Sequence, residues 1–257
     1  MTETTAMHDF PGTAAILRRE WSFVIGLLGD LAPAEWARPT RCAGWTIRDL
    51  ACHTVWGVSM EADALRRLRT GDPGPANGHT MAEGSTAPEV LARLRRAADE
   101  LCSAVDVLGP GAETGSCPLP YGDIPLPAAL DIFVFEAGIH ASDFADAVDV
   151  DRPLAEGVVR PVAAVSSLFL PVFATTGSVP PEGTSFSLQG HTVLLEGQWT
   201  GSGLAMGAVG RPTFAVIGDD SSVLLFANGR LGLDDPRLRV EGATELAQAF
   251  KTYVPGP

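Results

Sequence analysis

The sequence predicts a helical bundle followed by a small α+β domain, and two observations support this fold class. The first part of the chain, up to about residue 150, has four long segments with apolar residues at helical spacing, separated by Gly/Pro-rich loops. After it, short apolar or alternating segments bounded by turn residues are typical of strands. We therefore expect an antiparallel four-helix bundle in residues 1–152 and a small α+β domain in residues 153–257.

Each expected helix has its own start signal. Pro11 is a good first-turn residue, and Thr46 followed by Asp49 resembles a capping box. Thr86 and Glu89 repeat that pattern, and Pro125 precedes the last long apolar segment. The four helices are expected at residues 11–32, 46–70, 86–108 and 125–148.

The second part mixes both kinds of element. Residues 155–175 have the length and apolar content of one more helix. The segments TSFSLQG, HTVLLEGQW, SGLAMGA and TFAVIG predict strands. Two short helices are expected near residues 219–228 and 243–253, with RLRVEG as a strand between them.

Charge and composition exclude several classes of partner. The net charge is −13 and the pI is about 4.7, which makes nucleic acid and anionic membrane surfaces unlikely ligands. No uninterrupted apolar run reaches the length of a membrane span, and the first residues lack the basic and apolar regions of a secretory signal. The four cysteines form no C-x-x-C pair and are expected to be reduced and structural. We expect a cytoplasmic protein.

Three side chains are candidate metal ligands. Glu136 and His140 lie four residues apart in the fourth helix and therefore share one face, while His53 lies on a mostly apolar face of the second helix. Two imidazoles and one carboxylate are a typical ligand set for catalytic zinc, which keeps its fourth position open. The alternatives are an ion-paired helix face for the pair and a satisfied core histidine for His53.

Two motifs give the chain a family resemblance. They are Trp36-x-x-Pro39-Thr40-x-Cys42-x-Gly44-Trp45-Thr46-x-x-Asp49-Leu50-x-x-His53 and Glu136-x-x-x-His140-x-x-Asp143. Both resemble the signature segments of the mycothiol-dependent maleylpyruvate isomerase family, part of the DinB-like group of metal-binding four-helix bundles. The segment LLFANGRLGLDDPRLRVEG is similar to the sterol-carrier-like domain that follows the bundle in many members.

The resemblance implies a divalent metal, zinc above all, held by His53, Glu136 and His140. It also implies mycothiol as the low-molecular-weight thiol that occupies the open position. A free thiol has a pKa of about 8.5, and coordination to Zn²⁺ removes its proton. The thiolate could then add to a double bond, displace a leaving group or exchange with another conjugate of a small electrophilic substrate.

Two more residues are candidates for a catalytic role. Asp143 could orient a ligand histidine from the second shell, or it could cap a loop or pair with an arginine. The resemblance makes Arg230 a candidate for binding a carboxylate of the substrate or thiol across the domain interface, and a surface arginine in a turn is the alternative. Cys42, Trp36 and Trp45 are expected to be structural.

The remaining histidines and the competing functions complete the expectations. His8, His79 and His191 are expected to be incidental. A non-catalytic metal-binding or small-ligand carrier protein is the alternative to an enzyme, and it would have an apolar tunnel in residues 155–257 and no open metal position. We expect a monomer or homodimer that binds a small substrate and a thiol.

Overall fold

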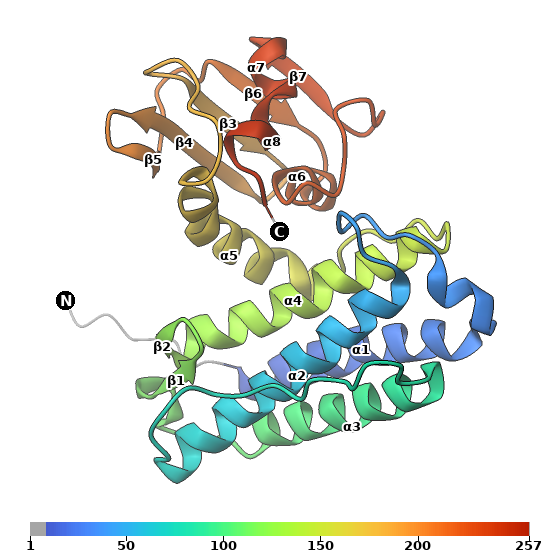
Figure 1. Cartoon of the computed structure of the whole chain (residues 1–257). Coiled ribbons are helices and arrows are strands. Elements are labelled where there is room, and N and C mark those ends of the chain that lie inside the picture. Colours follow the sequence, from blue (N-terminus) through green and yellow to red (C-terminus); the bar gives the residue numbers. More distant parts are fainter. Residues whose placement is uncertain (1–8, 257) are drawn as a thin grey trace. The chain divides into compact units, whose positions relative to one another are not determined.

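The computed structural model describes residues 9–256. The chain forms two compact units, and the boundary between them in the sequence lies between Arg152 and Pro153. The first unit is a bundle of helices, and the second combines helices with a five-stranded sheet (Figure 1). The predicted fold class is therefore confirmed.

The first unit contains four long helices and a small hairpin. Its elements are α1 (Phe10–Asp30), η1 (Pro33–Ala37), α2 (Ile47–Thr70), α3 (Ala87–Asp106), η2 (Ala112–Thr114), β1 (Ser116–Leu119), β2 (Gly122–Pro125) and α4 (Leu126–Ala147). Each long helix lies within three residues of its expected bounds. Periodic apolar segments of this length leave little ambiguity about helix existence, whereas helix ends depend on local caps.

The caps that start α2 and α3 are the ones the sequence predicts. The Asp49 carboxylate accepts hydrogen bonds from the backbone N–H of Thr46 at 2.9 Å and from its hydroxyl at 2.6 Å. The Thr46 hydroxyl in turn accepts from the backbone N–H of Asp49 at 3.2 Å. The Glu89 carboxylate accepts from the backbone N–H of Thr86 at 2.6 Å. These contacts satisfy backbone donors that a helix start otherwise leaves free.

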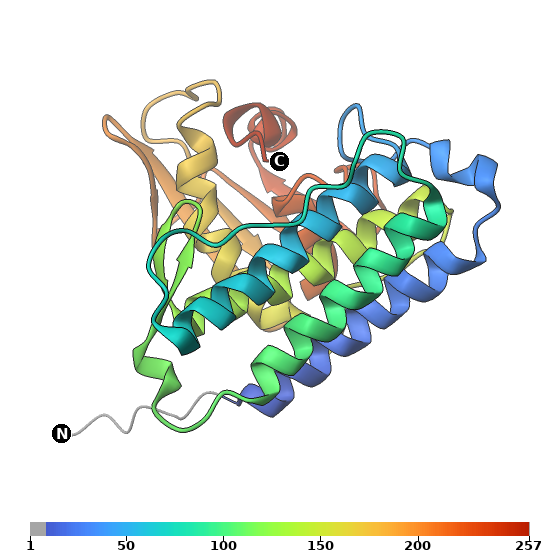
Figure 2. The same cartoon turned by 60° about the horizontal axis from the view of Figure 1, so that its bottom comes forward.

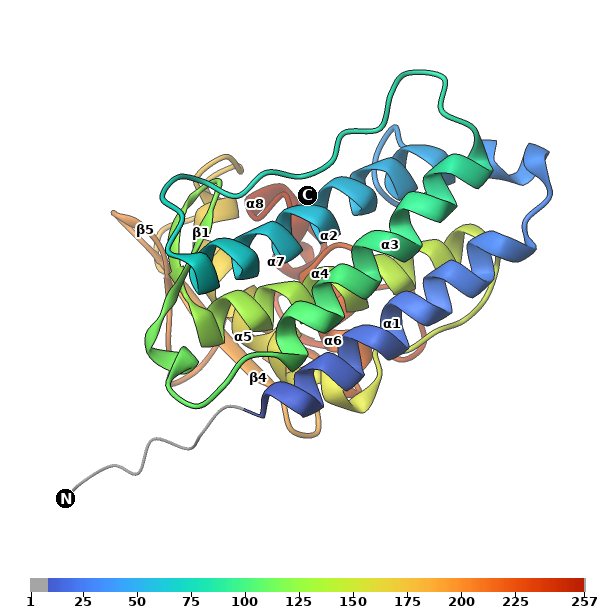
Figure 3. The ribbon, with the colours of Figure 1, turned by 90° about the horizontal axis from the view of Figure 1, so that it is seen from below.

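The structure also sets the direction of each helix. The link of residues 71–86 runs back along α2 before α3 begins, so α2 and α3 are parallel neighbours (Figures 2 and 3). Helix α1 is antiparallel to α3, and α4 is antiparallel to α2 (Figure 3). The long link thus makes α2 and α3 parallel where a short loop would force an antiparallel pair, and α1 and α4, which also pack together, are parallel as well (Figure 3).

The hairpin before α4 is absent from the sequence prediction, which treats residues 109–124 as a loop. Strands β1 and β2 pair antiparallel, with Cys117 opposite Ile124. Each has only four residues, and both contain proline, so neither gives a clear alternating pattern. Cys117 and Leu119 are buried, and β1 packs against α2 and α4.

Helix α4 is the most buried helix of the unit. It packs against α1, α2 and the hairpin, and its apolar residues are buried on nearly all sides. A helix that is apolar all round lies in the interior. Its few polar residues therefore meet an interior environment, in which each polar atom needs a partner.

The second unit is built around one mixed sheet. Its elements are α5 (Glu156–Ala174), β3 (Ser185–Gln189), β4 (Leu194–Thr200), β5 (Gly203–Met206), β6 (Phe214–Ile217), α6 (Asp220–Ala227), β7 (Arg239–Gly242), α7 (Thr244–Gln248) and α8 (Phe250–Tyr253). The strand order is β5-β4-β3-β6-β7, and only β3 and β6 pair parallel. The one helix expected near residues 243–253 is two short helices, α7 and α8, and the other elements were expected within a few residues.

Aromatic side chains form the core of the second unit. The rings of Phe186, Phe214 and Phe250 are fully buried and pack on one another, and Phe186 and Phe250 also pack on Trp199, with centroids 5.1–6.4 Å apart. Among the helices of residues 9–256, α5 alone is long and apolar enough to cross a membrane, judged by length and composition only. It packs against β5 and α6.

Candidate metal centre

The structure brings the three predicted ligands together. His53 comes from α2, and Glu136 and His140 come from α4, with their ligand atoms within 4.8 Å of one another. The His53 and His140 rings meet edge to face at a centroid distance of 5.2 Å. His140 is buried, His53 is half-buried, and the Glu136 side chain is 34% exposed. The group is thus accessible from one side, as a site that binds an exogenous molecule requires.

Both ring nitrogens of His140 face carboxylates. Nε2 lies 3.1 Å from Oε2 of Glu136, and Nδ1 lies 3.1 Å from Oδ2 of Asp143. A neutral imidazole has one N–H, so one of these two contacts would join an acceptor to an acceptor. A second proton on the ring or a cation shared with Glu136 resolves this conflict. The donor set therefore fits a divalent metal between His140 Nε2, Glu136 and His53.

The pKa values of the two histidines shift in opposite directions. Burial lowers the pKa of His53, and the neighbouring His140 lowers it further. Burial also disfavours the charged form of His140, but the hydrogen bonds to Asp143 and Glu136 outweigh it and raise the pKa to about 9. A metal must compete with that proton, because only the neutral imidazole is a ligand.

Asp143 supports His140 from behind and connects it to the loop before α2. Its carboxylate Oδ2 also accepts from the Cys42 thiol at 3.5 Å. Cys42, His140 and Asp143 form a second group of potential ligand atoms, but all three are buried and they share His140 with the first group. We assign them a supporting role, because a carboxylate on the far nitrogen of a ligand histidine fixes its tautomer and orientation.

Ion pairs hold the loop of Cys42 against α4. Arg41 contacts Asp146 at 2.7 Å, and Arg38 contacts Asp149 at 2.6 Å. They fasten the loop to the C-terminal end of α4, next to Asp143. The predicted structural role of Trp36 is supported by its burial. Cys42 does more than fill space, since it reaches the carboxylate that orients His140.

The sequence analysis gave Trp45 only a structural role and did not consider Glu61. Trp45 is 37% exposed, and its ring lies 4.9 Å from the His53 ring, so it also borders the site. Glu61 is buried and lines a small cavity together with His53, Glu136 and His140. Burial raises the pKa of Glu61 well above its usual range, and the charge of Glu136 adds to the shift. Position 61 shares a helix face with His53, which was the available signal.

Arg230 lies in the second unit, in the turn after α6. It is buried, with 8% exposed, and its guanidinium donates to the backbone oxygen of Asn228 at 2.7 Å. Asn228 is itself fixed by a hydrogen bond to Ser166 at 2.8 Å. Arg230 is thus held inside its unit, unlike a surface arginine in a turn. Its predicted contact with a carboxylate across the domain interface stays a prediction.

The other cysteines and histidines lie apart from the ligand groups. All four cysteines are free thiols, and Cys102 and Cys117 have pKa values raised by burial to about 11 and about 12. Such thiols are inert packing residues, as expected. Neither His79 nor His191 belongs to a ligand group found in residues 9–256. His8 lies outside the described residues.

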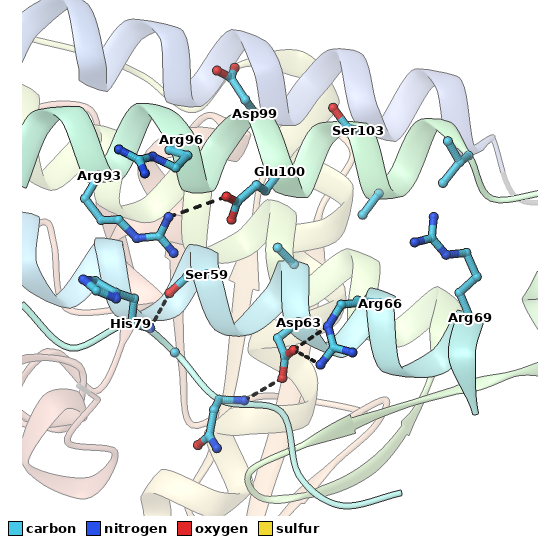
Figure 4. A pocket seen from close by; sticks show the side chains of 15 residues that line it. Ser59, Asp63, Arg66, Arg69, His79, Arg93, Arg96, Asp99, Glu100 and Ser103 are labelled. Atoms are coloured by element: carbon cyan, nitrogen blue, oxygen red, sulfur yellow. Dashed lines mark hydrogen bonds and ion pairs between the residues drawn. The ribbon is translucent and has the colours of Figure 1, made fainter. Parts of the chain in front are cut away.

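A larger pocket of about 790 Å³ lies elsewhere on the first unit, between α2, α3 and the link of residues 71–86 (Figure 4). Arg93 pairs with Glu100 at 3.6 Å, Arg66 pairs with Asp63, and the backbone N–H of His79 donates to Ser59. None of the three ligand residues lines it. The link of residues 71–86 thus lines this larger pocket, and it does not line the small cavity at the candidate metal site.

Fold and site together define a four-helix bundle whose facing helices supply a candidate metal centre from inward-pointing side chains. Residues 17–145 match the family of the mycothiol maleylpyruvate isomerase N-terminal domain, and the chain belongs to that family. The matched range contains His53, Glu136, His140 and Asp143 and excludes Arg230. The predicted resemblance is confirmed.

Two solved structures are similar to the chain over most of its length. They are crystal structures of the mycothiol-dependent maleylpyruvate isomerase and of a mutant of it. Each is 16% identical in sequence to this chain and has a TM-score of 0.67. The matched region covers 94% of this chain and 96% of the chain in the solved structure. No curated protein matches the sequence. At this identity the structural likeness establishes the common fold.

Proposed function

We propose that this protein is a zinc-dependent or other divalent-metal enzyme that activates a low-molecular-weight thiol, mycothiol, for reaction with a small electrophilic substrate. The reaction is an isomerisation of the maleylpyruvate type, a transfer or a thiol exchange. One observation carries the proposal: His53, Glu136 and His140 converge within 4.8 Å from two helices, with one side accessible. Family membership supports mycothiol as the thiol, because the family and the similar solved structures are described as mycothiol-dependent or mycothiol maleylpyruvate isomerases.

The site residues divide the work in this proposal. When bound, the metal supplies the positive charge that makes a thiolate available near neutral pH. His53, Glu136 and His140 hold it and leave one position for the thiol. Asp143 fixes His140 through Nδ1, so that Nε2 is directed at the metal. Arg230 binds a carboxylate of the substrate or the thiol. The reduced cysteines and the thiol chemistry fit a cytoplasmic protein.

The first test is metal content. Wild-type protein, His53→Ala and the control His79→Ala are purified in parallel and analysed for zinc. We expect about one zinc per chain in the wild type and in His79→Ala, and loss of zinc in His53→Ala, because two remaining protein ligands hold zinc weakly. Equal and negligible zinc in all three proteins would contradict the proposal.

The second test separates an enzyme from a carrier. The zinc-loaded protein is incubated with mycothiol and maleylpyruvate, and then with other electrophiles, and consumption of each is measured. Turnover that requires mycothiol and disappears in His53→Ala is the expected result. Zinc binding without thiol-dependent turnover of any electrophile would favour a non-catalytic metal-binding or carrier protein instead.

A further inference from the structure

Glu61 is a buried carboxyl group that the ligand set does not use. It lies on α2, its residue is 1% exposed, and its Oε2 atom has no hydrogen-bond partner among residues 9–256. Burying an acidic group without a partner is costly, so such a group in a folded protein calls for an explanation. The other buried glutamate of the bundle, Glu20, has two partners: Arg152 at 2.6 Å and Arg19 at 2.9 Å.

The position of Glu61 relates it to the metal ligands. His53, Gly57 and Glu61 are spaced four residues apart and follow one face of α2. All three line the cavity that Glu136 and His140 also line. Gly57 leaves the space between them free, because a Cβ atom there would meet nothing within 4 Å. Gly57 thus leaves free space on the helix face between His53 and Glu61.

A second unpartnered group lines the same cavity. The indole Nε1 of Trp21, on α1, is buried and has no hydrogen-bond acceptor in the described part of the chain. The cavity has room for about one water molecule. Two residues that carry an unsatisfied donor and an unsatisfied acceptor therefore line a space of the size of one small polar group. This arrangement is that of a binding position for such a group.

We propose that Glu61 is a positioning residue of the metal centre: its carboxylate would accept a hydrogen bond from a water molecule at the open metal position, and its charge favours the cation. This inference rests on the proposed metal site. The physical reason is electrostatic, since the buried carboxylate of Glu61 and the partly exposed one of Glu136 repel each other without a cation and are both stabilised by one. The unpartnered carboxyl group of Glu61 destabilises the metal-free protein, but it would stabilise the bound metal.

Glu61→Gln tests the inference, with Glu20→Gln as the matched control. Both variants neutralise a buried glutamate of the bundle without changing its size, but only Glu61 lines the cavity. Two quantities are measured: zinc affinity by competition with a chelator, and the thermal stability of the metal-free protein. We expect Glu61→Gln to bind zinc about 10-fold or more weakly, the scale of second-shell effects, while its metal-free form is at least as stable as the wild type.

The control is expected to show the opposite pattern. Glu20→Gln weakens two ion pairs, so its stability falls while its zinc affinity stays at the wild-type value. Glu61→Asp, which keeps the charge, is expected to retain more affinity than Glu61→Gln, and it serves as the test if Glu61→Gln does not fold. Zinc affinity within twofold of the wild type in the Glu61 variants overturns the inference alone. Absence of zinc from the wild type overturns the proposed function as well.

Discussion

His140 organises the site at the scale of single residues. One of its nitrogens is directed toward Glu136 and the other toward Asp143, which the Cys42 thiol also contacts. The sequence spacing placed Glu136, His140 and Asp143 on one helix face but left the role of Asp143 open. The 3.1 Å contact to Nδ1 favours the orienting role over a loop cap.

Replacing Asp143 with Asn tests that role. The neutral amide can accept the same hydrogen bond, but it stabilises the metal-bound imidazole less than a carboxylate does. We expect Asp143→Asn to lower zinc affinity by about 10–100-fold, measured by chelator competition. The control is Asp146→Asn, which alters a partly exposed carboxylate of the same helix that pairs with Arg41. If both variants keep wild-type affinity, Asp143 has no orienting function.

At the scale of elements, α2 and α4 divide the site between them. Helix α4 contributes two ligands at a spacing that one helix fixes locally, whereas α2 contributes His53 and Glu61 from across the bundle. The capping box at Thr46 and Asp49 sets the start of α2 and hence the phase of its faces. Gly57 is an unusual residue for the middle of such a helix.

Glycine to alanine substitutions measure how much stability the protein loses by having a glycine at position 57 of α2. Gly57 on α2 and Gly26 on α1 both lie within helices, and a Cβ atom at either position would meet nothing within 4 Å. Each Ala variant should therefore raise the free energy of unfolding by about 0.5–1 kcal/mol through helix propensity, as measured by chemical denaturation. Only Gly57→Ala narrows the cavity. Destabilisation by Gly57→Ala, with Gly26→Ala stabilising as expected, would show that the site lacks the space we describe.

At the scale of the whole molecule, the second unit contains a lysine whose charged form is destabilised by its surroundings. Lys251, the only lysine, is half-buried, and burial together with the charge of the nearby Arg230 guanidinium lowers its pKa to about 8. The lowered value means that the unfolded chain holds this proton more tightly than the folded protein does. Stability should therefore rise with pH between about 8 and 10.5, where the unfolded state binds more protons.

Lys251→Met removes this effect. We expect the variant to be more stable than the wild type below pH 8, by about 3 kcal/mol at most from the size of the shift. The advantage should shrink as pH rises toward 10.5, the unfolded value. Denaturation of both proteins across this range isolates Lys251, because other groups titrate equally in the two. A constant difference at all pH values would mean that Lys251 is not desolvated.

Local signals explain why most elements were predictable. The four long helices have apolar residues at helical spacing and start signals, either a capping residue or a proline, and both kinds of signal act within a few residues. The hairpin of β1 and β2 lacked such signals, since its short, proline-containing strands are stabilised by packing on α2 and α4. The parallel direction of α2 and α3 likewise depends on the path of a long link, which composition does not encode.

The sequence by itself determined the helices, the change to an α+β unit and the Glu136–His140 pair, because helical spacing is a local property of the chain. Only the tertiary structure decided that His53 meets this pair, that Asp143 and Cys42 lie behind His140, and that Glu61 and Trp21 share the cavity without partners. These relations join residues from different helices. They depend on how the helices pack, and a single glutamate in α2 otherwise has the pattern of a solvated residue.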